Sequence, residues 1–150
     1  MNKHTKVDEI LKLIVEFAES NDMVLAAGLC GSWAKGDARA DSDIDLIIIV
    51  ENKLRFKRKD WIEKLDFGKI NEKVESFGDE VYGQVWSRRV SLIGKIEIEF
   101  SFAEKTWADT KNLDEGTYKV VSEGFNIIFD PQLILKRLVE KVVIEMELKK

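Results

Sequence analysis

The feature that most restricts the fold lies in residues 28–50, where two acids, Asp43 and Asp45, stand at the head of an apolar run over residues 46–50. The apolar run predicts a buried β-strand. Because side chains alternate across a strand, Asp43 and Asp45 face the same side, about 6 to 7 Å apart along the chain. Two such carboxylates repel each other unless a cation lies before them, and oxygen ligands suit Mg²⁺ or Mn²⁺. The pair predicts a metal site, although acids that merely alternate at a strand end give the same pattern.

A glycine–serine turn precedes the acids. Residues 23–30 form a short apolar run that predicts another buried strand, and Gly31 and Ser32 follow it directly. A strand, a tight turn and a helix start leave backbone N–H groups where an anion can bind. Glycine permits close approach of a phosphate because it has no Cβ atom, and Lys35 lies within one turn. The turn therefore predicts a phosphate site, although such turns also join strands to helices without a ligand.

The two features together resemble the signature of the DNA polymerase beta-like nucleotidyltransferase superfamily, and most of all its minimal, single-domain members. The matching residues are Gly31-Ser32-Trp33-Ala34-Lys35-Gly36 and Ser42-Asp43-Ile44-Asp45-Leu46. The resemblance implies that the Gly31-Ser32 turn holds a nucleoside triphosphate and that Asp43 and Asp45 bind metal and take part in catalysis. Lys35 and Ser42, within the same strings, are further expected contacts of the nucleotide.

The resemblance also implies a third carboxylate on a neighbouring strand, because two metal ions need a bridging acid and further ligands. Residues 95–102 alternate apolar with polar side chains, so Glu97 and Glu99 share one face. Residues 81–92 predict another strand, and Gly94-Lys95 supplies a hairpin turn between the two. Glu99 is the favoured catalytic acid and metal ligand, since the Phe-Ser-Phe after it is similar to the sequence that follows the third acid in several family members. Glu97 is the alternative, and the acid is Glu where many members have Asp.

Composition limits the size and the partners of the protein. A chain of 150 residues that is 45% apolar is expected to form one domain over residues 1–150. A net charge of −4 argues against general binding of nucleic acids. No apolar run approaches the roughly 18 residues of a membrane span, and the charged N-terminus lacks the apolar stretch of a signal peptide. We therefore expect a cytoplasmic protein without membrane contact.

Two basic features of the sequence each allow two interpretations. Residues 53–59 contain five basic residues in seven, which either receive a triphosphate or an anionic acceptor or form a solvated surface. Arg88 and Arg89 lie on opposite faces of a predicted strand, so only one of them points toward the acids. There it would hold phosphate or pair with Glu97 or Glu99. The sequence leaves both questions open.

The expected fold is an α/β (α+β) nucleotidyltransferase domain. Helical periodicity predicts a first helix over residues 5–20, a less regular one over residues 61–74 and a closing helix after Asp130-Pro131. Between the last two, residues 120–129 form two short apolar pieces around Gly124. We expect a mixed sheet of four to five strands with helices mainly on one face, and an active site at the ends of the strands that carry the acids.

The resemblance implies transfer of a nucleoside monophosphate from a nucleoside triphosphate, with ATP as first choice, to an acceptor hydroxyl, using Mg²⁺ or Mn²⁺. The acceptor is a small molecule or a protein of unknown identity, since family members modify antibiotics, proteins and nucleic acids with the same core. Two alternatives are an antitoxin-like partner of a toxin–antitoxin pair and a non-catalytic nucleotide-binding module of the same fold. The short chain leaves little for a separate acceptor domain, and a homodimer could supply the missing wall.

Overall fold

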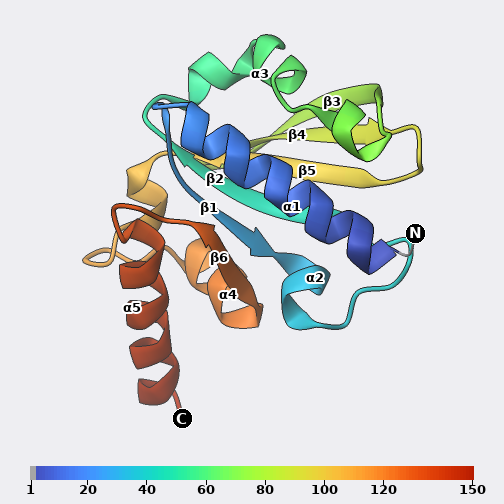
Figure 1. Cartoon of the computed structure of the whole chain (residues 1–150). Helices are drawn as coiled ribbons and strands as arrows, with labels where there is room; N and C mark the ends of the chain where they lie inside the picture. Colours follow the sequence, from blue (N-terminus) through green and yellow to red (C-terminus); the bar gives the residue numbers. More distant parts are fainter. Residues whose placement is uncertain (1–2) are drawn as a thin grey trace.

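The structure, a computed structural model, describes residues 3–150, which are built around a six-stranded mixed sheet (Figure 1). The strands are, in spatial order, β3 (Val74–Tyr82), β4 (Val85–Leu92), β5 (Glu97–Ala103), β2 (Ile44–Val50), β1 (Val24–Cys30) and β6 (Phe125–Phe129). The β2–β5 pair is parallel and every other neighbouring pair is antiparallel. The predicted α/β class and the mixed sheet are confirmed, with six strands instead of four to five.

The helices cover both faces of the sheet. The α-helices are α1 (Lys3–Ser20), α2 (Gly31–Lys35), α3 (Asp60–Glu63), α4 (Glu115–Glu123) and α5 (Ile134–Leu148), with 3₁₀ turns η1 (Lys53–Lys57), η2 (Phe67–Ile70) and η3 (Lys105–Ala108). Leu46 and Ile48 of β2 pack with α1 and α3, while Ile47 and Ile49 pack with α5 and η3. The prediction of helices mainly on one face was wrong, because the central strand β2 is apolar on both sides and needs cover on both.

The first and last helices confirm the helical periodicities in the sequence. The buried side of α1 carries Ile10, Ile14 and Phe17, and that of α5 carries Leu138 and Val142. These spacings of three and four residues place each set on one helix face. No helix within residues 3–150 is long and apolar enough to cross a membrane.

The segment over residues 60–92 differs from the prediction. The helix predicted over residues 61–74 is only α3 and η2, and the strand predicted over residues 81–92 is the end of β3, a turn at Gly83 and β4. Gly83 has φ of 58°, in the left-handed region that lets the chain reverse. Every β3 residue after Val74 is exposed, so this edge strand carries no apolar alternation that would have revealed it.

The other turns match their sequence signals. β4 pairs with β5 in antiparallel fashion around Gly94 and Lys95, and Lys95 has φ of 61°. Gly124, with φ of 144°, ends α4, and β6 follows directly. The two apolar pieces around Gly124 are thus one helix end and one strand.

Candidate functional site

Four carboxylates lie on one face of the sheet, at the end of the parallel pair where β2 and β5 begin. Asp45 of β2 lies directly beside Glu99 of β5. Asp43 immediately precedes β2, and Glu97 opens β5. Because positions two apart share a strand face, these side chains are on the α5 side, which Ile47 also occupies. We call Asp43, Asp45, Glu97 and Glu99 the acid cluster; the structure assembles it from two segments that are far apart in the chain.

The glycine–serine turn lies against this cluster. Gly31 begins α2 with φ of 69°. A Cβ atom at Gly31 would collide with the Asp45 carboxylate, so both the backbone angle and the lack of space require glycine. The turn and the acids predicted from separate patterns therefore form one site.

The other predicted nucleotide contacts lie around α2. Ser32 is half-buried and its carbonyl accepts bonds from the backbone N–H groups that close the helix, while Lys35 is exposed in the last turn. Ser42 Oγ accepts a hydrogen bond from the Arg39 N–H at 2.8 Å. Trp33 Nε1 donates to the Ser42 carbonyl at 3.3 Å. The Trp33 bond connects the loop before Asp43 to α2, a role for Trp33 that the sequence did not reveal.

Arg89 neutralises much of the acid cluster. It lies opposite Glu99 in the β4–β5 register. Its Nη1 donates to Asp43 and lies 3.3 Å from Glu97 Oε2, and its Nη2 lies 3.7 Å from Glu99 Oε2. The hydrogen bond to Asp43, assisted by the charges around it, raises the pKa of Arg89, so the guanidinium stays charged. The structure thus answers the question that the sequence left open: Arg89 faces the acids and Arg88 does not.

Asp45 has a strongly altered acidity. Burial first, and then the charge and hydrogen bond of Glu99, raise the pKa of Asp45 from 3.8 to about 7, while Arg89 opposes the shift. Adjacent carboxylates in a partly dry site favour keeping one proton between them. The neighbouring Cys30 is affected as well: burial, with the charges of Asp45 and Glu99, raises its pKa to about 12. Cys30 therefore stays a neutral thiol near pH 7, which disfavours a nucleophilic role.

The donor chemistry of the acid cluster suits a hard divalent cation, since its side chains offer only carboxylate oxygens. The raised Asp45 pKa marks negative charge that a cation would relieve. Within residues 3–150, however, no three His, Cys, Asp or Glu side chains are arranged as a ready metal site. The Arg89 guanidinium is the cation that Asp43, Glu97 and Glu99 contact. Metal binding by these acids stays a prediction.

A cavity of about 430 Å³ adjoins the cluster. Glu99 forms part of its wall, and Ser87 and Ser101 share a hydrogen bond of 2.8 Å beside it. Aromatic walls come from Tyr82, next to the β3–β4 turn, and from Trp107 in η3. Sequence reasoning missed both aromatic residues, because they reach the site only through the sheet order and the η3 connection.

The family model described as Polymerase beta, Nucleotidyltransferase matches residues 12–81. No curated protein matches the chain. Three solved structures are similar to it at low identity. An aminoglycoside 6-adenyltransferase from Bacillus subtilis has a TM-score of 0.49 and 14% identity, over 67% of this chain and 35% of that one. A toxin–antitoxin complex with AMP-PNP has a TM-score of 0.46 and 13% identity, over 91% of this chain and 86% of that one. A GLD-2/RNP-8 complex has a TM-score of 0.42 and 18% identity, over 66% of this chain and 40% of that one.

The matched segment contains the Gly31-Ser32 turn, both strand acids and the whole of β1 and β2. It includes the motif on which the predicted resemblance rests, and the resemblance is confirmed. Residues 12–81 of this chain thus match a polymerase beta-type nucleotidyltransferase domain.

Proposed function

We propose that this protein transfers a nucleoside monophosphate from a nucleoside triphosphate, with ATP as donor, to an acceptor hydroxyl on a small molecule or protein, and releases pyrophosphate. The match of residues 12–81 to the nucleotidyltransferase family model supports nucleotidyl transfer as the general class. The observation that carries the finer proposal is the contact geometry of one site: Asp45 beside Glu99 on parallel strands, with the Gly31 turn packed against Asp45.

Asp43, Asp45 and Glu99 would hold Mg²⁺ or Mn²⁺, with Glu97 as the alternative ligand. A bound ion would neutralise charge on the phosphates and favour the alkoxide form of the acceptor. The Asp45 pKa of about 7 belongs to the site without metal, and a bound cation would lower it, so Asp45 acts as a ligand. In this proposal Glu99, which lies beside Asp45, accepts the proton of the attacking hydroxyl.

The turn and the adjacent cations would orient the donor. The backbone at Gly31, the Ser32 and Ser42 hydroxyls and the Lys35 ammonium group would bind the phosphates. Arg89, which is 39% exposed, can exchange its carboxylate partners for a phosphate oxygen. Fixing the phosphates in this way positions the reacting phosphorus for in-line attack.

The acceptor would enter the 430 Å³ cavity beside Glu99. Its volume falls within the range of about 300 to 1,000 Å³ that is usual for small-molecule sites. Tyr82 and Trp107 provide apolar walls, and the Ser87–Ser101 pair provides hydroxyl groups. This lining suits a molecule with an apolar body and a few hydroxyl groups, or a tyrosine or serine side chain of a protein.

The direct test is transfer from ATP labelled at the α-phosphate. The wild-type protein, with Mg²⁺ or Mn²⁺ and a cell extract, should release pyrophosphate and label one acceptor, and EDTA should abolish both. Pyrophosphate release would exclude the non-catalytic module. If calorimetry with millimolar ATP and metal shows no heat, and the melting temperature does not rise, then the donor site is not the one proposed, since a native-state ligand must stabilise the fold.

A further inference from the structure

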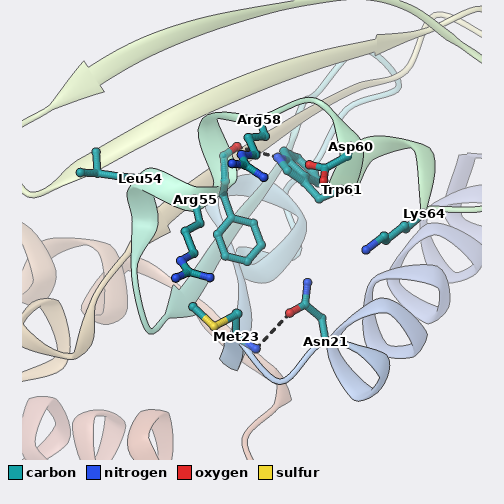
Figure 2. Close-up of a pocket in the computed structure, with 9 residues that line it drawn as sticks. Asn21, Met23, Leu54, Arg55, Arg58, Asp60, Trp61 and Lys64 are labelled. Carbon is teal, nitrogen blue, oxygen red and sulfur yellow. Dashed lines mark hydrogen bonds between the residues drawn. The ribbon is translucent and has the colours of Figure 1, made fainter.

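A second cavity, of about 600 Å³, lies between the α1–β1 turn, η1 and α3 (Figure 2). Three cations, Arg55, Arg58 and Lys64, and one acid, Asp60, line it, so the wall carries a net charge of +2. In Figure 2, Arg55 and Lys64 point into the opening from opposite sides. Two of the cations belong to the basic run over residues 53–59, which the proposed function does not use. We call this cavity the basic pocket.

The cations of the basic pocket are not paired with acids of residues 3–150. Within the part of the chain that the structure describes, neither Arg55, Arg58 nor Lys64 forms an ion pair, and all three are exposed. The whole chain carries −4, so this is a positive concavity on an acidic protein. Grouped like charges in a concave surface attract an anion from solution.

The backbone that carries these cations is fixed by hydrogen bonds from an arginine and two tryptophan side chains. Arg88, which is 2% exposed, donates at 2.8 Å to the carbonyls of Arg58 and Lys57. Trp61 Nε1 donates to the Phe56 carbonyl at 2.6 Å. Trp86 Nε1 donates to the Lys53 carbonyl at 2.8 Å, which holds the start of η1. A segment held at four carbonyls presents its side chains in a prearranged way, and this lowers the entropy cost of binding.

The basic pocket is remote from the acid cluster. Its floor residues Phe56 and Trp61 belong to the core on the α1 side of the sheet, whereas Asp45 faces the α5 side. Met23, on its wall, bonds through its carbonyl to Glu51, just beyond the far end of β2. The strand from Asp45 to that end spans roughly 17 Å at about 3.3 Å per residue. A phosphate in the basic pocket therefore cannot contact the acids.

We propose that the basic pocket is a separate binding site for a nucleoside di- or triphosphate. Arg55, Arg58 and Lys64 contact the phosphate groups, and Met23 and the 62% exposed Leu54 pack against the base or sugar. The cavity volume fits a ligand of this size. A long nucleic acid is disfavoured, since the net negative charge beyond the pocket would repel its backbone. The proposal is independent of nucleotidyl transfer.

The test is calorimetric titration of the full chain with ADP in EDTA, which keeps metal from the acid cluster. ADP should bind, and Arg55→Gln/Arg58→Gln should weaken it at least tenfold, with Lys64→Gln acting in the same direction. The control Lys119→Gln/Lys136→Gln removes two positive charges from exposed sites on α4 and α5 and should leave the affinity unchanged. Melting temperatures should not fall in any of these variants, because the replaced side chains form no hydrogen bond or ion pair with the residues that the structure describes.

Further titrations test which part of the nucleotide is bound and how the charge of the wall contributes. Pyrophosphate should bind and adenosine should not, and Asp60→Asn should strengthen ADP binding several-fold by removing the one acid of the wall. The proposed nucleotide site would be wrong if ADP did not bind in EDTA, or if the pocket variant and the control lowered the affinity for ADP equally. The assignment to a small nucleotide would be wrong if a single-stranded oligonucleotide bound more tightly than ADP and Arg55→Gln/Arg58→Gln abolished that binding.

Discussion

Arg88 and Arg89 are neighbours on β4, yet each serves a different side of the sheet. Arg88 is 2% exposed, donates to two backbone carbonyls and Asp79, and lies 5.0 to 5.6 Å from three aromatic rings. Arg89 is 39% exposed and its partners are three carboxylates of the acid cluster. Two arginines in succession thus do different work: Arg88 supports the basic pocket on one face of the sheet, and Arg89 neutralises the acids on the other.

The difference lies in what could replace each arginine. The Arg88 guanidinium that these carbonyls accept from is 2% exposed, so water has little access to replace it there. The carboxylates around Arg89 face the open end of the site, where a metal ion or a proton can compensate the same charge. Arg88 is thus a structural residue, whereas Arg89 is an exchangeable counter-ion. The predictions that follow test this contrast.

The largest effect is expected from Asp45→Asn. The substitution removes a carboxylate from the centre of the acid cluster with almost no change of shape, so nucleotidyl transfer should fall by about a thousandfold or more. Stability should stay equal or rise, because a like charge beside Glu99 disappears. Pyrophosphate release and urea midpoints measure the two quantities.

Asp79→Asn is the matched control on the other face. Asp79 pairs with Arg88 at 2.8 Å, so this variant should lose stability and keep its activity per folded molecule. If Asp45→Asn unfolds readily but remains active, then the acid pair is scaffolding and the enzyme proposal fails.

Arg88→Met should cost about 3 kcal/mol of unfolding free energy, because it leaves the carbonyls of Lys57 and Arg58 without donors in a buried position. Arg89→Met should cost less than about 1 kcal/mol, since its ion pairs are partly exposed. Denaturant titrations measure both losses of unfolding free energy, and the two values are comparable if the m-values are unchanged. Equal losses would show that both arginines are structural.

Within the acid cluster, Glu99→Gln should reduce transfer by about a hundredfold or more, while Glu97→Gln should leave a measurable fraction. Glu99 lies beside Asp45 in the parallel register, and Glu97 is 45% exposed at the strand start, near Ser91 and Arg89. Steady-state rates at saturating metal and ATP provide the comparison. Loss only in Glu97→Gln would reverse the assignment.

Removing the Arg89 counter-ion should strengthen the binding of a metal ion by the acid cluster. Arg89→Met should tighten Mn²⁺ binding by about tenfold, because a positive charge that contacts the same carboxylates is gone. Electron paramagnetic resonance of free Mn²⁺ measures this without any turnover. Arg137→Met, which removes a positive charge from an exposed site on α5, should not change the affinity. An unchanged affinity in Arg89→Met would mean that Arg89 does not compete with metal.

The last effect concerns the pH dependence of stability. Because the pKa of Asp45 is raised from 3.8 to about 7, the native state holds this proton more tightly than the unfolded chain does. Its contribution to stability is present in full below pH 3.8 and is lost as the pH rises toward 7. Asp45→Asn should therefore gain stability relative to the wild type across this range in the absence of metal. A constant difference would mean that Asp45 titrates normally.

Local patterns predicted much of the site. Strand alternation placed Asp43 with Asp45 and Glu97 with Glu99, and the short run from Gly31 to Gly36 gave the turn and the helix α2. The same reasoning failed for β3, whose exposed edge position leaves no apolar signature, and for the helix predicted over residues 61–74. Alternation and turn chemistry are properties of a few neighbouring residues, whereas edge strands are defined by the strands beside them.

The amino-acid sequence by itself therefore determined which side chains share a strand face, where the glycine must lie and that β2 is buried, because each depends on local geometry and apolar content. Only the tertiary structure decided that Asp45 lies beside Glu99, that Arg89 and not Arg88 meets the acids, and that the basic run closes over a cavity on the opposite face. These depend on the parallel register of β2 with β5 and on the packing of η1 over the sheet, which bring distant segments together and have no local signal.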